Sequence, residues 1–301
     1  MINKQQYWPL FLAVPGIGRQ TLLNLLSLTK RHHLTLEEVW QAKQIPEFFH
    51  LTSKQMTGIS NFKKKYSISD YYEMLAERNI RLIFQEDDNY PFLLKQIDDP
   101  PILLYAKGPN LFVDQAINRA IAVVGTRQIT EYGKVVTSKI VKELVDLDLM
   151  IISGFMYGVD LKAHSQAIKS VGKTIGVLGY GFDYCYPQSI RKFYDYFLDS
   201  GGMLISEFAP NTQVRPGNFP TRNRIVAGLS LGVVVIEAAI KSGSHITAQY
   251  ALDNGRTVFA VPGPITSPFS EGTKWLVNQG AVLVGSGQEI WENLKNELNE
   301  F

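Results

Sequence analysis

From residue 119 onward, short apolar runs alternate with amphipathic helical stretches, and this alternation constrains the fold more than any other feature of the chain. Helical patterns such as Val135–Leu147 and Val159–Ile168 separate most of the runs. Apolar strands that alternate with helices form βαβ units, in which the strands are parallel and helices cover both faces of the sheet. We therefore predict an α/β fold with a mostly parallel sheet. The predicted strands are Ile121–Val124, Met150–Ile152, Thr174–Leu178, Met203–Ile205, Val233–Ile236, Thr257–Val261 and Ala281–Val284.

The first 75 residues show a different pattern of apolar residues, which predicts short helices. Leu22, Leu25 and Leu26 recur at helical spacing, and a Pro15-Gly16-Ile17-Gly18 turn separates two apolar segments. This turn resembles a helix–hairpin–helix, in which glycines let backbone N–H groups come close to a phosphate or to another helix. A packing module that binds nothing fits the same pattern, and both interpretations stay open.

Composition bounds the class of protein. The formal net charge is only +2, so a nucleic-acid footprint would have to be local. The single cysteine, Cys185, excludes an intramolecular disulfide and a cysteine-rich zinc site, which fits a reducing cytoplasm. No apolar run is long enough to span a membrane, and the N-terminus lacks a signal-peptide pattern. We expect a cytoplasmic protein with no membrane segment.

The loops that follow the predicted strands carry the candidate binding residues, because ligands of open α/β sheets bind beyond the carboxyl ends of the strands. The first such loop is Gly125-Thr126-Arg127, which combines a permissive glycine, a hydroxyl and a planar cation suited to phosphate. The second begins with Ser153-Gly154. Alternatively, the first loop is only a tight turn and its arginine is solvated.

Two residues after the second strand raise the question of catalysis. Asp160 stands at an expected helix N-terminus, where capping is worth about 1 kcal/mol, and His164 follows four residues later. They would form an acid–base pair if they faced one site, but a structural role is the more common one for such a histidine. No serine or cysteine nucleophile with a supporting set of residues accompanies them, so we predict no catalytic residues and no metal site.

Aromatic and basic residues follow the third strand. The aromatic side chains either stack nucleic-acid bases, which is worth about 1–3 kcal/mol per base, or pack in the core. The basic pair Arg191-Lys192 comes next. The aromatic residues are Tyr180, Phe182, Tyr184 and Tyr186.

The strongest candidate site flanks the fifth strand. Asn218 and the run Arg222-Asn223-Arg224 precede that strand, and Lys241-Ser242-Gly243-Ser244 follows it. A helix through Ile246–Leu252 comes next, so the serines and Thr247 would lie in its first turn. Hydroxyls and unpaired N–H groups at a helix N-terminus form a phosphate cradle. The chain has no complete P-loop and no G-x-G-x-x-G after a strand, so we predict no cofactor.

Read together, these loops resemble one family, DNA processing protein A (DprA, also called Smf). The matching segments, in order, are VGTR at 124–127, SGFMYGVD at 153–160, GYGFD at 179–183, YP at 186–187, SE at 206–207, FPTRNRIVAGLS at 219–230, VIEA at 235–238, SGSHITA at 242–248, GRTVFAVPG at 255–263 and GAVLV at 280–284. The resemblance covers residues 80 to 285. The departures from the family pattern are Tyr157, Gln188 and Ile190.

The resemblance implies an extended Rossmann-like domain that binds single-stranded DNA, is usually a homodimer and loads the recombinase RecA during natural transformation. It makes the strand-end residues named above candidate DNA contacts. On this basis we predict a helical N-terminal domain of the helix–hairpin–helix or SAM-like kind over 1–75 and a connector over 76–118. The DNA-binding domain would then span 119–287, and a terminal helix without a winged-helix domain would span 288–301.

The rival hypothesis is a nucleotide hydrolase of the phosphoribohydrolase (lysine-decarboxylase-like) kind. Such enzymes need a catalytic glutamate near the glycine-rich loop, and this chain has no acidic residue between Ser242 and Leu252. Glu207 and Glu237 are the carboxylates best placed at strand ends. We expect them to hold loop N–H groups or to pair with Arg222 or Arg224. A third possibility is an interaction scaffold, in which Thr273–Val277 forms a surface for self-association or for RecA.

Overall fold

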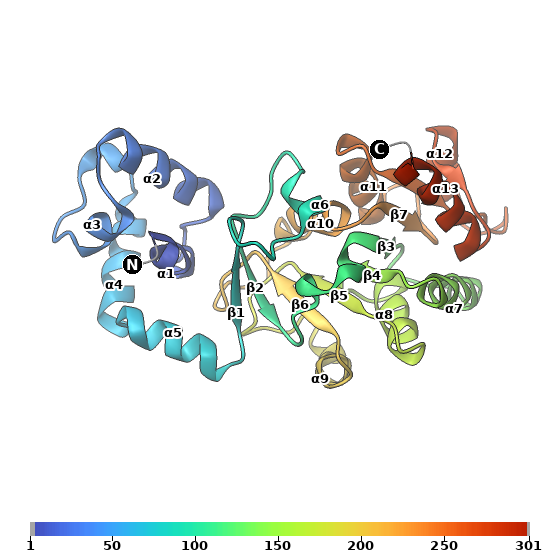
Figure 1. Cartoon of the computed structure of the whole chain (residues 1–301), viewed down its shortest axis with the longest axis horizontal. Coiled ribbons are helices and arrows are strands. Elements are labelled where there is room, and N and C mark those ends of the chain that lie inside the picture. The colour runs from blue at the N-terminus through green and yellow to red at the C-terminus, as the bar shows by residue number, and fades with distance from the viewer. Residues whose placement is uncertain (1–3, 300–301) are drawn as a thin grey trace.

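A computed structural model describes residues 4–299 of the chain, with the side chains of residues 5–295. Within that range a nine-stranded sheet forms the centre of the molecule, in the order β1-β2-β6-β5-β4-β3-β7-β8-β9 (Figure 1). The strands are β1 (Arg81–Phe84), β2 (Leu103–Lys107), β3 (Ala120–Val124), β4 (Met150–Ser153), β5 (Thr174–Leu178), β6 (Met203–Ser206), β7 (Gly232–Val235), β8 (Thr257–Ala260) and β9 (Val282–Leu283).

The strands from β3 to β9 pair with one another in parallel, as the apolar runs predicted. All seven predicted strands are confirmed to within one or two residues at each end. β2 pairs antiparallel with β6, and β1 pairs antiparallel with β2. The segment predicted as a connector, 76–118, therefore supplies two strands at one edge of the same sheet.

Helices cover both faces of the sheet, which confirms the predicted α/β class. Alternate residues of β3 point to opposite faces, as the strand repeat requires. Ile121 and Val123 pack with α7 (Glu131–Asp146), α8 (Val159–Lys169) and α13 (Gly287–Asn299). Ala122 and Val124 share the core on the other face with α6 (Phe92–Lys95), α10 (Asn218–Gly228), α11 (Gly243–Asp253) and α12 (Glu271–Asn278).

The N-terminal residues fold into a helical module beside the β1–β2 edge (Figure 1). Capping boxes begin three of its helices, at Thr35, Thr52 and Ser67. Phe11 and Trp40 belong to an apolar core that continues into the sheet domain. Its elements are η1 (Lys4–Tyr7), α1 (Trp8–Ala13), α2 (Arg19–Arg31), α3 (Leu36–Gln41), η2 (Glu47–Phe49), α4 (Ser53–Lys65) and α5 (Ile68–Glu77).

Four further helices complete the list of elements. The predicted domain limits at residues 75, 118 and 287 stay a prediction. The remaining helices are η3 (Leu111–Val113), η4 (Gln115–Arg119), η5 (Gln188–Ile190) and α9 (Arg191–Asp199). Across residues 4–299, no helix is both long enough and apolar enough to cross a bilayer.

The strand order creates a topological switch point. From β3 the chain moves through β4 and β5 to β6 on one side, and it then returns to place β7 on the other side of β3. Ligands of such sheets bind in the crevice where the order reverses. The loops after β3 and β7 meet there, and both carry candidate binding residues.

Candidate functional site

The site is organised by one turn of helix α10, which holds Arg222, Asn223 and Arg224. Arg222 is only 3% exposed, and its Nη1 donates hydrogen bonds to the carbonyl oxygens of Gly154 and Val177. These carbonyls lie at the ends of β4 and β5. Arg222 therefore fastens two strand ends from beneath the surface.

Arg224 fastens a third strand end in a similar way. It is 4% exposed, and its Nη2 donates to Oε1 of Glu207 at 2.6 Å, directly after β6. Its Nε contacts Oδ2 of Asp99 at 3.0 Å, and Arg19 of the N-terminal module forms an ion pair with the same carboxylate. The expectation that Glu207 pairs with an arginine is confirmed.

Asn223 connects α10 to the serine-rich turn after β7. Its Oδ1 accepts from Nε of Arg222 at 3.1 Å, and its Nδ2 donates to the carbonyl oxygen of Gly243 at 3.2 Å. The Ser242 hydroxyl accepts from the N–H of Ser244 at 3.3 Å, so it caps α11. Ser244 and Thr247 are buried, whereas Lys241 and Gly243 are exposed.

The loop after β3 is held by Glu237, which lies in the segment directly after β7. The N–H of Thr126 donates to the carbonyl oxygen of Glu237 at 2.7 Å. The Glu237 carboxylate accepts from the N–H of Thr130 at 3.0 Å and from its hydroxyl at 2.6 Å, which confirms that this glutamate holds loop N–H groups. Arg127 is exposed, and its guanidinium lies 5.7 Å from the centre of the Phe219 ring.

The loop after β4 is closely packed around Gly154. A Cβ atom at this position would lie 2.6 Å from Oδ2 of Asp160 and 2.7 Å from Nη2 of Arg222, so any other residue would force these buried side chains to shift. Asp160 is buried and accepts from the N–H of Met156 at 3.3 Å. Burial raises the pKa of Asp160 to about 6, although the charge of Arg222 opposes the shift. The Ser153 hydroxyl donates to the carbonyl oxygen of Val123 at 2.7 Å.

His164 belongs to the hydrophobic core and does not face the crevice at the carboxyl ends of the strands. Its side chain is fully buried and packs on Phe155 and Phe197. Nδ1 lies 2.7 Å from the hydroxyl of Thr174, which donates to the carbonyl oxygen of Ile151, so Nδ1–H is the donor. Burial lowers the pKa of His164 to about 3. The imidazole is therefore neutral and structural.

The aromatic residues after β5 divide into two groups. Tyr180 and Phe182 are buried, so they pack in the core. Tyr186 is 40% exposed, and its ring centre lies 5.8 Å from that of Phe219. Phe219, which sequence reasoning did not select, thus joins Arg127 and Tyr186 in one cluster. The sequence did offer a signal for Phe219, because it directly precedes Pro220 and lies three residues before the Arg222-Asn223-Arg224 run.

The basic residues at the start of α9 are exposed. Arg191 pairs with Asp195, with Nε and Oδ2 3.1 Å apart, and lies over the ring of Tyr194. Lys192 is exposed beside it. In the described part of the chain, no group of three or more His, Cys, Asp or Glu side chains is placed to hold a metal ion.

We call the rim the surface formed by the loops after β3, β4, β5 and β7, the start of α9 and residues 215–224. Its exposed members include Arg127, Lys192, Lys241 and Gly243, while Arg222 and Arg224 are buried beneath it. The fold and the site therefore define a class: Rossmann-like α/β proteins that carry a basic, glycine- and serine-rich rim at the switch point of the sheet.

Comparison with known proteins narrows that class. A family model described as DNA recombination-mediator protein A matches residues 81–295. DNA processing protein DprA of Bacillus subtilis is 42% identical over 76% of this chain and 79% of its own length. The chain therefore belongs to the DNA recombination-mediator protein A family, as the motif pattern predicted.

Solved structures agree with this assignment. The X-ray structure of DNA processing protein A from Streptococcus pneumoniae has a TM-score of 0.76 and 32% identity, and the match covers 95% of this chain and 97% of that one. A structure of DNA processing protein A from Helicobacter pylori has a TM-score of 0.62 and 27% identity, covering 74% of this chain and 97% of that one. The Helicobacter structure is described as showing a unique single-stranded DNA binding mode.

Proposed function

We propose that the rim binds single-stranded DNA. The observation that carries this proposal is the cluster of Arg127, Phe219 and Tyr186, in which an exposed cation lies over one aromatic ring and a second, exposed ring stands beside it. Cations that follow the phosphates and aromatic rings that stack bases are the usual elements of single-strand binding. The binding mode described for the Helicobacter relative supports the same assignment.

We divide the predicted site residues by their burial. The exposed side chains Arg127, Lys192 and Lys241 would contact phosphates, and the exposed backbone at Gly243 would allow a close approach. Arg222 and Arg224 would act by positioning the loops, because both guanidinium groups already bind internal acceptors. The residues that complete the proposed rim are Gly125, Thr126, Ser153, Gly154, Arg191, Asn218, Asn223, Ser242, Ser244 and Thr247.

The test is fluorescence anisotropy with a labelled 20-nucleotide single strand and the matching duplex at several salt concentrations. We expect Arg127→Ala and Lys241→Ala each to lower the slope of log K against log[salt] by about 0.7, the value for one lost phosphate contact on a single strand. The matched control is Lys169→Ala, since Lys169 is exposed at the C-terminus of α8, just before β5 begins, and therefore lies near the amino ends of the strands, away from the rim. Unchanged slopes in both rim variants would exclude the rim as the DNA site.

We infer that the rim is a binding surface and not a hydrolytic site. Glu207 is engaged with Arg224, and Glu237 with Thr130, so neither carboxylate is available as a catalytic base. Incubation with nucleoside monophosphates should release no free base. Release of base that disappears in Glu237→Gln would favour the hydrolase alternative.

We also propose, from the family resemblance, that the chain acts in the cytoplasm as a homodimer and loads RecA onto single-stranded DNA during natural transformation. The α12 segment Thr273–Val277 offers a surface for such contacts, because Trp275 is 43% exposed and stacks on His245 with 5.2 Å between ring centres. Light scattering of the protein and of Trp275→Ser tests self-association. RecA filament assembly on a coated single strand, with and without the protein, tests loading.

A further inference from the structure

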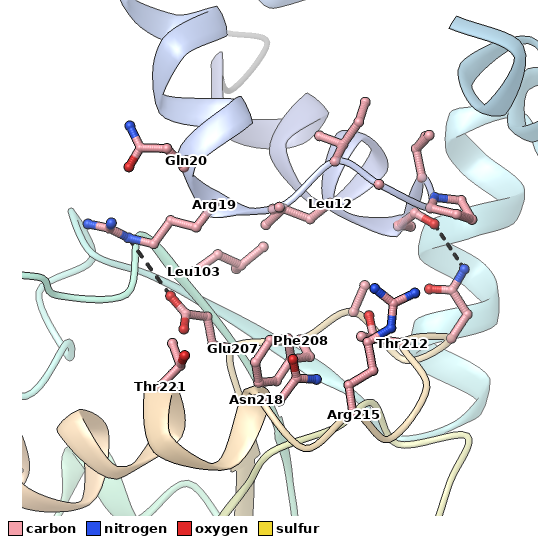
Figure 2. Close-up of a pocket in the computed structure, with 18 of the residues that line it drawn as sticks. Leu12, Arg19, Gln20, Leu103, Glu207, Phe208, Thr212, Arg215, Asn218 and Thr221 are labelled. Carbon is pink, nitrogen blue, oxygen red and sulfur yellow. Dashed lines mark hydrogen bonds and ion pairs between the residues drawn. The ribbon is translucent and has the colours of Figure 1, made fainter. Parts of the chain in front are cut away.

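A pocket lies between helices α4 and α5 of the N-terminal module and two segments of the sheet domain, the loop after β5 and the segment that follows β6. We call it the α4–α5 pocket. Its volume of about 340 Å³ is at the lower end of the range of small-ligand sites, about 300–1,000 Å³. It adjoins a larger cleft of about 890 Å³, across which Arg19 faces Glu207 (Figure 2). The α4–α5 pocket has room for one nucleobase.

The walls of the α4–α5 pocket are fixed, because contacts between its lining residues hold the module against the sheet domain. Nδ2 of Asn211 donates to the carbonyl oxygen of Ala13 at 2.9 Å. Nη1 of Arg78 donates to Oδ1 of Asp183 at 2.6 Å. A ligand therefore enters a pocket that needs no domain movement to form.

Aromatic side chains form one wall of the pocket. The ring centre of Phe62 lies 5.3 Å from that of Tyr66 and 5.4 Å from that of Tyr71, and all three residues line the pocket. Phe62 and Tyr71 are buried, whereas Tyr66 is partly exposed. Nucleobases stack on aromatic side chains, because every base has a π face. The exposed part of Tyr66 therefore offers a base a stacking surface.

Two lysines beside this wall have no carboxylate partner. Lys65 is exposed and lines the pocket, and its Nζ lies 4.9 Å from the centre of the Tyr66 ring. Lys107 is partly buried, and its Nζ lies 5.5 Å from the centre of the Phe182 ring. Among the described residues, no carboxylate forms an ion pair with either lysine. Both ammonium groups therefore remain available to a phosphate.

Positive charge exceeds negative charge around Lys107. Burial lowers the pKa of Lys107, and the like charges of Arg78 and Arg191 lower it as well, whereas Asp183 and Asp195 oppose this shift. Both of these carboxylates are already paired, Asp183 with Arg78 and Asp195 with Arg191. A phosphate beside Lys107 would therefore compensate a charge that the protein leaves uncompensated.

The charge of the N-terminal module favours the same class of ligand. Residues 1–75 hold nine Lys and Arg against five Asp and Glu, whereas residues 76–301 hold 21 against 23. The net positive charge of the chain therefore resides in the module, to which α4 and α5 belong. This charge attracts polyanions toward the pocket.

The pocket adjoins the rim through the loop after β5. Asp183 lines the pocket, and Tyr186, three residues later in the same loop, contacts Phe219 on the rim. Arg191, at the start of α9, also belongs to the rim, and it is close enough to Lys107 to lower its pKa. A strand that leaves the rim beside α9 therefore meets Lys107 and the pocket next.

We propose that a single DNA strand that crosses the rim continues into the α4–α5 pocket, where one base packs against Tyr66 while Lys65 and Lys107 bind phosphates. This path extends that of the strand on the rim, so it rests on the proposed function. The N-terminal module then takes a direct part in DNA binding, through residues that lie outside the rim.

The first test measures the salt dependence of binding to a labelled dT20 strand by fluorescence anisotropy. We expect Lys65→Gln and Lys107→Met each to lower the slope of log K against log[salt] by about 0.7, the value for one lost phosphate contact on a single strand. Circular dichroism and urea unfolding verify that both variants fold.

The matched control is Lys30→Gln, which removes the same charge from an exposed lysine near the C-terminal end of α2. Lys30 lies about 16 Å along the helix from Arg19, which pairs with Asp99 of the sheet domain. Its substitution should leave the slope unchanged. A slope in either Lys65→Gln or Lys107→Met equal to that of Lys30→Gln would overturn the proposal.

The second test asks whether the pocket takes a base. We expect Tyr66→Leu, which keeps an apolar side chain but removes the ring, to weaken dT20 binding by about tenfold, the loss of one base stack. With an abasic strand of the same length, this variant and the unsubstituted protein should bind equally, because no base is present to stack. Equal weakening with both strands, or no weakening with dT20, would refute the base-binding role of Tyr66.

The rim variants keep failure of this path distinct from failure of the proposed function. If Arg127→Ala and Lys241→Ala lower the slope but the two α4–α5 pocket variants do not, the strand crosses the rim and does not enter the pocket. If Lys65→Gln and Lys107→Met lower the slope but the rim variants do not, the pocket binds DNA and the rim assignment is wrong.

Discussion

Replacing the buried Arg222 by Met tests whether this arginine holds the strand ends together. The substitution keeps an unbranched side chain but removes the donors to the carbonyl oxygens of Gly154 and Val177 and the positive charge that faces Asp160. Each unpaired carbonyl costs about 1–3 kcal/mol, and breaking a buried charge pair costs about 3–5 kcal/mol in total. We expect the free energy of unfolding to fall by about 3–5 kcal/mol at pH 8.

The loss should depend on pH, and its sign follows from Asp160. Burial raises the pKa of Asp160 in the folded protein to about 6, and the nearby Arg222 charge opposes this rise. Removing that charge therefore raises the pKa of Asp160 further. A group with a raised folded pKa contributes stability below its unfolded pKa of about 3.9, and this contribution is lost as the pH rises through the folded value. At high pH, each further rise of the Asp160 pKa by one lowers the free energy of unfolding by about 1.4 kcal/mol. Arg222→Met should therefore lose less stability at pH 5 than at pH 8.

The assay is urea unfolding of the unsubstituted protein, Arg222→Met, Asp160→Asn and the double variant at pH 5 and pH 8. We expect Asp160→Asn to restore part of the stability that Arg222→Met loses at pH 8, because the amide carries no charge to leave uncompensated. The reasoning is refuted if Arg222→Met loses less than about 1 kcal/mol at pH 8, or if its loss is the same at both pH values.

Two further substitutions test the packing around the rim. Gly154→Ala should lower the free energy of unfolding by about 1–3 kcal/mol, because its Cβ would lie 2.6 Å from Asp160 and 2.7 Å from Arg222, and both are buried. The control is Gly243→Ala, whose Cβ would meet nothing within 4 Å. Equal stability of the two variants would contradict the prediction. His164→Asn should change the pH dependence, since the folded pKa of about 3 lies below the unfolded value of about 6.5 and stability is lost as the pH falls between them. From pH 7 to pH 5 the unsubstituted protein should lose about 2 kcal/mol relative to this variant in urea unfolding, and parallel curves would exclude the role of His164.

The central sheet was predictable because parallel strands buried on both faces read as continuous apolar runs. β3 shows this most clearly, since all five of its residues are buried. The edge strand β1 was missed because its apolar run, Leu82–Phe84, is short and lies outside the alternation of strands and helices, where it pairs antiparallel with β2. The strand-end loops were selected as the candidate site from their position alone, and their binding role stays a prediction.

The placement of the arginines could not be predicted from the chain. A basic residue near a glycine-rich loop looks the same in sequence whether it faces solvent or binds internal acceptors. The acceptors of Arg224 include Asp99, which lies 125 residues away along the chain. The cleft beside the N-terminal module depends on similar long-range contacts, such as the ion pair between Arg19 and Asp99.

A single helical turn in α10 contacts the ends of β4, β5 and β6 and the turn before α11. These four segments therefore cannot shift independently, since moving one would break bonds to the others. An incoming strand would therefore meet a surface whose shape was set when the protein folded, so the rim proposed to bind it would lose little loop entropy on association.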